Sequence, residues 1–353
     1  MTSPRGARSQ SSYGWLVFIL LALGGLIYVK WFPYYHRAFT AEATHSIGKS
    51  ILTGGKSSAP APSVAAALDY AWAYGKAIWQ AMVLGLLLGS AVQALVPVHW
   101  VARVLGRHGF GSVAVGGLLA VPGMMCTCCA APVVVGLRAR GASAGGAIAF
   151  WLSNSVLNPA TLVFMGFVLG WRWSALRLVL GVLLVFGLGW VVNRLVTPQE
   201  ARAAEDHLEL LAEQQAEAGN MFIRWLCILA RMAVRLLPEY IVLVLLLGAT
   251  RAYLFPHIGS NVTSSVDWIV AFAVAGMLFV IPTAGEVPII QAMLALGVGV
   301  GPAGALLMTL PPVSVPSFAM LAGSFRRRVL ALVGMAVVLS GVVGGLTVVG
   351  LGF

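Results

Sequence analysis

Long apolar runs, separated by short polar or basic stretches, make up most of this chain. A membrane-spanning helix takes about 20 predominantly apolar residues. Such runs therefore predict membrane helices, and the clearest of them cover residues 14–29, 77–96, 176–192, 238–254 and 330–351.

Other apolar runs are interrupted by proline and glycine. A bilayer does not tolerate lipid-exposed irregular backbone, because its N–H and C=O groups would lack partners. We therefore expect these breaks to be buried in protein or to line a polar cavity, and to form the substrate region. They fall at Pro122-Gly123, Pro132 and Asn158-Pro159 in the first part of the chain, and at 282–288, Pro311-Pro312 and Pro316 in the second.

Proline and glycine spacings in the first part recur in the second. Four intervals agree in length to within one residue. In the first part they are Gly89–Pro97, Pro97–Pro122, Pro132–Gly141 and Pro132–Pro159, and in the second part, in the same order, they are Gly248–Pro256, Pro256–Pro282, Pro288–Gly297 and Pro288–Pro316. Repeated halves with broken helices at matching places are typical of secondary transporters. We expect an N-terminal anchor helix and polar loop (1–65), a first membrane repeat (66–193), an acidic linker helix (194–220) and a second repeat (221–353).

The basic residues favour inverted repeats. The loop 98–110 is basic, whereas its counterpart 257–267 contains no Lys or Arg. If the broken segments are re-entrant hairpins, each half crosses three times, and 98–110, 138–141 and 326–328 lie inside, as the positive-inside rule expects. Arg172 and Arg177 would then lie outside, against the rule. The predicted fold is an all-α polytopic membrane protein with roughly seven to ten membrane segments.

Composition excludes several other classes of protein. Charged residues make up 9% of the 353 residues, against about 25% in ordinary soluble domains, and the mean hydropathy is +0.92. The chain is too apolar for a soluble enzyme or a disordered protein. Its net charge of +11 comes from Lys and Arg scattered between apolar runs, so we expect no nucleic-acid partner. No phosphate-binding G-x-x-x-x-G-K motif is present, and we expect neither enzyme activity nor a cofactor.

The N-terminal apolar run has a second possible interpretation. A basic start followed by the apolar run 14–29 is also typical of a signal peptide, but the sequence from Lys30 to Pro33 is a poor cleavage site, which favours an uncleaved helix with its N-terminus inside.

The linker 194–220 carries six of the eleven acidic residues. It predicts an amphipathic connecting helix, and a partner-docking helix of a non-transporting membrane scaffold is the alternative.

Three cysteines lie within the first break. Cys126, Cys128 and Cys129 occupy three of four successive positions beside two methionines. Thiolates select soft centres such as Cu(I) and Zn, and trivalent arsenic is of the same kind, so we predict a soft-metal or metalloid site. Two alternatives stay open: the cysteines could be small residues at a tight helix contact, or Cys126 and Cys129 could be a C-x-x-C redox pair.

The second break contains an acidic residue, Glu286. A carboxylate within the membrane is costly and is a functional candidate by default, either as a proton carrier or as a stabiliser of a positive substrate. A structural hydrogen bond to open helix ends is the alternative. Polar side chains at the remaining breaks could cap broken helices or line the pathway, and those predicted to contact substrate are Asn154, Asn158 and Ser314.

The two proline-bounded motifs resemble a known family. The stretch from Pro122 to Pro132 (PGMMCTCCAAP), the segment 141–150 and Asn158-Pro159, with the later stretch from Pro282 to Pro288 (PTAGEVP), resemble the predicted permease family that includes YraQ and the organoarsenical efflux permeases (ArsP). The resemblance implies an integral permease, and it suggests that Cys126, Cys128 and Cys129 bind arsenic.

Taken together, these features predict a multi-pass permease of the cell inner membrane. We expect it to work by alternating access driven by an ion gradient, with the lipid bilayer and a small inorganic or organometalloid substrate as its partners. A homo-oligomer is compatible with the sequence.

Overall fold

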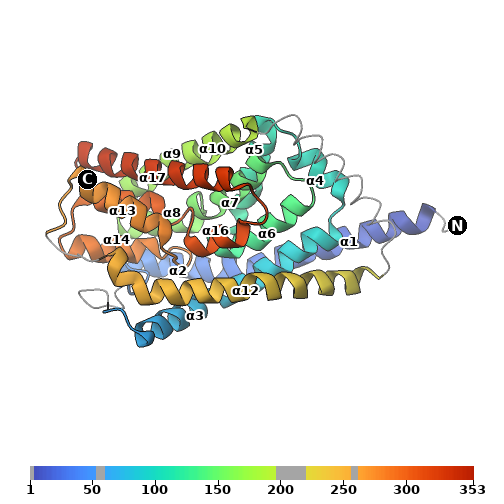
Figure 1. Cartoon of the computed structure of the whole chain (residues 1–353), viewed down its shortest axis with the longest axis horizontal. Helices are drawn as coiled ribbons and strands as arrows, with labels where there is room; N and C mark the ends of the chain where they lie inside the picture. The colour runs from blue at the N-terminus through green and yellow to red at the C-terminus, as the bar shows by residue number, and fades with distance from the viewer. Residues whose placement is uncertain (1–3, 53–59, 196–219, 256–260) are drawn as a thin grey trace.

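The computed structural model describes residues 4–52, 60–195, 220–255 and 261–353 (Figure 1). These residues form helices joined by short turns, and no strand occurs among them. The prediction of an all-α multi-pass membrane protein is confirmed. Six helical segments are long and apolar enough to cross a membrane: Gly14–Thr44, Val64–Leu95, Ala144–Val168, Trp171–Arg194, Met221–Leu254 and Arg327–Gly350.

An N-terminal helical segment precedes two halves of the same design. It consists of α1 (Pro4–Leu26), a π-helical turn (Ile27–Trp31) and α2 (Phe32–Thr44). The first half contains α3 (Val64–Leu95), α4 (Val98–Leu105), α5 (Phe110–Ala120), α6 (Thr127–Ala139), α7 (Ala144–Val156), α8 (Pro159–Val168), α9 (Trp171–Val182) and α10 (Leu188–Arg194). The second contains α12 (Met221–Leu254), α13 (Val266–Leu278), α14 (Glu286–Ala295), α15 (Val300–Thr309), α16 (Val315–Leu321) and α17 (Arg327–Gly350).

Local geometry shows that the two halves are repeats. Helices α6 and α14 both end at a glycine with positive φ, Gly141 at 82° and Gly297 at 85°. In both, the amide that follows the glycine donates to the carbonyl five residues back, as in a Schellman cap. The next amide donates at 2.7 Å to a carbonyl earlier in the same half, from Ser143 to Leu105 at the end of α4 and from Gly299 to Val262 before α13.

The first broken segment is a re-entrant hairpin. Helices α5 and α7 run in the same direction, because the Ser112 and Ser143 hydroxyl oxygens are 3.1 Å apart at their starts and the Ser153 hydroxyl donates to the Gly117 carbonyl near their ends at 2.8 Å. Between them α6 runs back, since the Trp151 indole late in α7 donates to the carbonyl of Thr127, the first residue of α6. The chain therefore enters through α5 and returns through α6.

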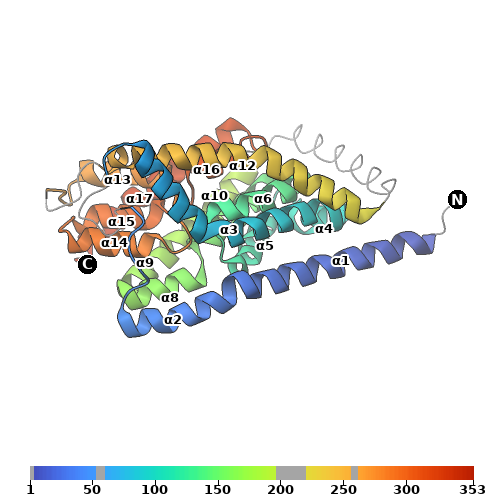
Figure 2. The ribbon, with the colours of Figure 1, turned by 90° about the horizontal axis from the view of Figure 1, so that it is seen from below.

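The halves are inverted with respect to each other. Helices α3 and α12 lie side by side in opposite directions (Figures 1 and 2). The Arg224 guanidinium at the start of α12 donates to the Ala94 carbonyl at the end of α3, and Arg251 near the end of α12 lies 5.4 Å from the ring of Tyr70 early in α3. The predicted inverted arrangement of the two repeats is therefore confirmed.

The N-terminal helical segment lies along the outside of this bundle (Figure 2). Only 6% of its most apolar window is buried, against 72% for α3, as expected for a peripheral helix facing lipid. The predicted acidic linker helix falls almost entirely on residues 196–219, which lie outside the described residues.

Candidate functional site

The breaks of the two halves meet at a small cavity. Its wall takes residues from the first break, from the α7–α8 junction and from the second break. The lining residues are Met125, Cys126, Ser155, Thr161, Ile281, Pro282, Thr283, Ala284, Glu286 and Pro311. Cys126 and Glu286, two of the predicted site residues, therefore lie at one cavity, to which both repeats contribute.

Two of the three cysteines form a pair. Cys126 is the residue preceding α6 and Cys129 lies in its first turn. Residues three apart share one face of a helix, and the two sulfur atoms are 2.9 Å apart. Both thiols are buried, and they lie at a helix N-terminus, where the helix dipole favours negative charge. The pair could therefore hold a soft centre between two sulfur atoms.

The third cysteine, Cys128, contacts the other half of the protein instead of the thiol pair. Cys128 lies two residues after Cys126, on the opposite side of the helix. Its sulfur is 3.5 Å from the hydroxyl of Ser314 at the start of α16 in the other half. Within the described ranges, no group of three Cys, His, Asp or Glu side chains is arranged to hold a metal ion.

The backbone of α6 lies unusually close to α3 at the thiol pair. A Cβ atom added to Gly85 of α3 would overlap the carbonyl oxygen of Cys129. Glycine is the residue that allows two helices to approach this closely. The position of the Cys129 thiol therefore depends on the absence of a side chain at Gly85.

The acidic residue of the second break is paired with an arginine from the first half. The Arg177 guanidinium donates from Nη1 to the Glu286 carboxylate, and both side chains are buried. Its Nε donates to the carbonyl of Val156 at 3.0 Å and its Nη2 to that of Ser155 at 2.6 Å. These carbonyls lie at the C-terminal end of α7, which carries partial negative charge. One guanidinium thus joins α9, α7 and α14.

This pairing places Arg177 inside the protein, whereas from the sequence it was interpreted only as a charge that bears on topology. The side chain is fully buried, whereas Arg172, one and a half turns earlier, is exposed and donates to the carbonyl of Leu351 at 2.9 Å. Sequence reasoning did not identify Arg177 as a site residue. The available signal was the position of Arg177 at an apolar run, because the buried carboxylate predicted at Glu286 requires a cation as its partner.

The predicted polar residues act mainly as helix caps. The Asn158 side-chain oxygen accepts from the Ala160 and Thr161 amides at 3.0 and 3.2 Å. Ser314 forms a capping box with Ser317 at the start of α16. The Asn154 amide nitrogen donates to the Phe150 carbonyl at 3.0 Å. Asn154 Oδ1 and Asn158 Nδ2 are nevertheless buried without a protein partner among the described residues, so each asparagine keeps one polar atom for water or substrate.

The N-terminal helical segment also reaches both breaks, which the sequence did not predict. The Trp31 indole donates to the carbonyl of Pro122 at 2.8 Å. The buried Lys30 ammonium donates to the Thr283 hydroxyl at 3.2 Å. It is also close enough to the Cys126 and Cys129 thiols to interact with them electrostatically. This helix is therefore part of the site as well as a membrane anchor.

Sequence comparisons identify proteins that are similar to this chain over most of its length. The UPF0718 protein YraQ of Escherichia coli (strain K12) is 49% identical over 350 residues, which cover 98% of this chain and 99% of that protein. A UPF0718 protein of Methanocaldococcus jannaschii is 24% identical over 334 residues, covering 75% of this chain and 90% of the relative. No solved structure gives a significant match.

A family model described as predicted permease, ArsP_1, matches residues 63–349. The match begins at α3 and ends in α17, so it contains both inverted halves and both breaks. It leaves out the N-terminal helical segment. The chain belongs to this family of predicted permeases.

Proposed function

We propose that this permease moves a thiophilic substrate, such as a trivalent (organo)arsenical or a soft metal ion, out of the cell through the cavity between the two breaks. The observation that carries the proposal is the buried Cys126–Cys129 pair, of which Cys126 lines the same cavity as Glu286 from the other half. Thiolate pairs favour soft centres over the hard cations that oxygen ligands bind.

The Arg177–Glu286 pair supplies a means of coupling transport to protons. A buried pair is stable while both groups are charged, and it loses its attraction when the carboxylate takes up a proton. Protonation of Glu286 would free Arg177, and with it the ends of α7 and α9, to change position relative to α14. This connection between the halves suits alternating access, in which one repeat moves against the other.

Arsenical tolerance in cells tests the substrate. Cells without other arsenical exporters would express the wild type, Cys126→Ser or Cys129→Ser, and would be grown on trivalent methylarsenical. We expect the wild type to confer tolerance and each serine variant to lose it at equal protein level. Cys227→Ser is the matched control, because Cys227 is an exposed thiol on α12. Tolerance that survives in both pair variants would refute the role of the thiols.

Transport in vesicles tests the direction and the driving ion. Inside-out vesicles of the cell inner membrane would be incubated with a panel of metalloids, metal ions and sulfur compounds under an imposed pH gradient. We expect uptake of soft substrates that depends on the gradient in the wild type, and uptake that no longer responds to it in Glu286→Gln. Full pH dependence in that variant would exclude the proton-carrier role.

A thiol-disulfide redox protein is the second candidate. The 2.9 Å separation of the Cys126 and Cys129 sulfur atoms favours it specifically, because the two thiols need little movement to form a bond. Trapping of thiols in living cells with an alkylating reagent separates the two functions. A permease keeps the pair reduced during transport, whereas a redox protein shows a fraction of the pair oxidised that changes with respiratory state.

A further inference from the structure

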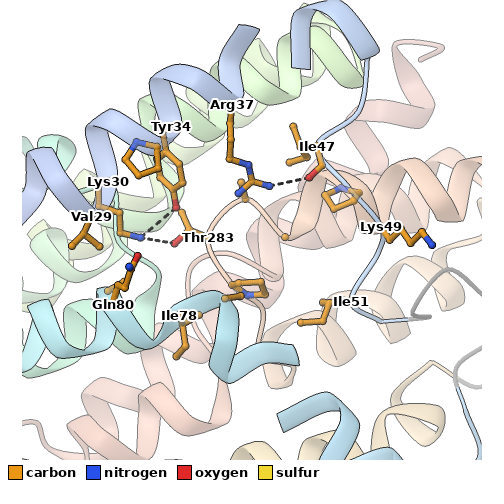
Figure 3. A pocket seen from close by; sticks show the side chains of 17 residues that line it. Val29, Lys30, Tyr34, Arg37, Ile47, Lys49, Ile51, Ile78, Gln80 and Thr283 are labelled. Atoms are coloured by element: carbon orange, nitrogen blue, oxygen red, sulfur yellow. Dashed lines mark hydrogen bonds between the residues drawn. The ribbon is translucent and has the colours of Figure 1, made fainter. Parts of the chain in front are cut away.

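A second cavity lies on the other side of the second break, between the N-terminal helical segment and α3 (Figure 3). It has a volume of about 260 Å³ and shares Pro282, Thr283 and Ala284 with the cavity at the thiol pair. Its size is below the usual range for drug-sized ligands, roughly 300–1,000 Å³. It is therefore suited to a small ligand with a few bound water molecules.

The charged side chains that line this cavity are all basic. They are Lys30, Arg37 and Lys49, and no acidic residue occurs among the described residues that line it. Lys30 and Arg37 point inward from the N-terminal helical segment, about two turns apart, whereas the amino group of Lys49 points away from them at the rim (Figure 3). Tyr34 and Gln80 add neutral hydrogen-bonding groups to the wall.

Lys30 is the central group, because it is buried and forms no ion pair with a carboxylate of the described residues. Its side chain is 3% exposed, and its hydrogen bonds go to two neutral hydroxyls, Tyr34 at 3.3 Å and Thr283 at 3.2 Å. The buried carboxylate of Glu286 is already paired with Arg177. A buried charge is costly unless it is paired, and a cavity beside such a charge gives room for a counter-ion.

The backbone around Lys30 also departs from regular helix. Lys30 lies in the π-helical turn Ile27–Trp31 between α1 and α2. Single π-turns inside α-helices occur frequently at functional sites. The guanidinium of Arg37 donates to the Ile47 carbonyl at 2.9 Å from one of its nitrogen atoms, which leaves further N–H groups for an anion.

We propose that this cavity, defined by Lys30 and Arg37, is a binding site for a small tetrahedral oxyanion such as sulfate or phosphate. Lys30 supplies a buried point charge and Arg37 a planar donor, the two cationic groups that proteins use to bind such anions. Both residues precede residue 63, where the family match begins. The two basic residues therefore lie outside the part of the chain that the family model covers, whereas α3 and the second break supply other parts of the wall.

Calorimetric titration of the full-length protein tests the proposal. The protein would be held in nanodiscs of zwitterionic lipid and titrated with sodium sulfate, with sodium chloride at equal ionic strength as the reference. We expect saturable sulfate binding to the wild type, weakened at least tenfold in both Lys30→Gln and Arg37→Gln. Lys76→Gln is the matched control, because Lys76 is an exposed cation of α3 that stacks on Trp72 outside the cavity, and it should bind as the wild type does.

Each outcome decides the question. Absence of saturable sulfate binding to the wild type, or equal binding by wild type and Arg37→Gln, would overturn the proposal. Arg37 is exposed, so its substitution leaves folding intact even if Lys30→Gln does not fold. Repeating the titration in nanodiscs with phosphatidylglycerol identifies the natural source of the anion. Weaker sulfate binding there assigns the site to a lipid phosphate, and unchanged binding assigns it to a free oxyanion.

Discussion

Replacement of Arg177 by methionine tests the buried connection between the two halves. Methionine is of comparable length but carries no charge and no donor. The variant would leave the Glu286 carboxylate buried without a cation, and the Ser155 and Val156 carbonyls without their guanidinium donor. Breaking a buried ion pair by removing one partner costs about 3–5 kcal/mol. We expect Arg177→Met to lower the free energy of unfolding by that amount.

The double variant Arg177→Met/Glu286→Met separates the charge from the hydrogen bonds. It removes the unpaired carboxylate, so we expect it to be more stable than Arg177→Met alone. It still lacks donors for the two carbonyls at the end of α7, and each orphaned buried group costs about 1–3 kcal/mol. The double variant should therefore lie between the wild type and the single variant, with a coupling energy that a double-mutant cycle measures directly.

Unfolding by sodium dodecyl sulfate in mixed micelles, followed by tryptophan fluorescence, gives these free energies. Arg172→Met is the control, because Arg172 is an exposed arginine of the same helix. Its substitution should change the stability by no more than about 0.5 kcal/mol. The reasoning is refuted if Arg177→Met is as stable as Arg172→Met, or if the double variant is less stable than Arg177→Met.

Three further predictions concern the backbone around the breaks. Gly85→Ala should push α6 away from α3 at Cys129 and lower the free energy of unfolding by about 1–3 kcal/mol. It should also abolish arsenical tolerance, and tolerance equal to that of the wild type would contradict the close approach. Asn158→Ala should cost about 1 kcal/mol through loss of the cap of α8, and Asn158→Asp, which keeps the cap oxygen, should retain most of it in the same unfolding assay. Gly141→Ala and Gly297→Ala should each cost about 1–2 kcal/mol, because both positions have positive φ, and clearly unequal costs would argue against the equivalence of the two turns.

The architecture was largely predictable from local features of the sequence. Proline and glycine act through the backbone of their own segment, so the spacing of Gly141 and Gly297 after Pro132 and Pro288 identified equivalent turns without knowledge of the fold. The contrast between the basic loop 98–110 and its counterpart predicted the inversion for the same reason. Both signals depend on the residue itself and not on a distant partner.

The site was less predictable, because it depends on contacts between distant residues. Arg177 and Glu286 are 109 positions apart, and the charge rule treated Arg177 as a loop residue without a partner. Lys30 directly follows the apolar run 14–29, and nothing near it in the sequence indicates its hydrogen-bond partner Thr283, which lies 253 positions away. The thiol group was predicted from adjacency along the chain, but the helix that begins at Thr127 divides it into a pair and a single cysteine.

The long separation of Arg177 and Glu286 has a consequence for biogenesis. The chain is synthesised at about 5–20 residues per second, so Arg177 emerges roughly 5–20 s before the carboxylate that neutralises it, 109 residues later. During that interval the first half carries an uncompensated guanidinium in an apolar segment. We expect this half to remain beside the insertion machinery until the second half arrives. A first half expressed alone should then be degraded, and one co-expressed with a separate second half should be rescued.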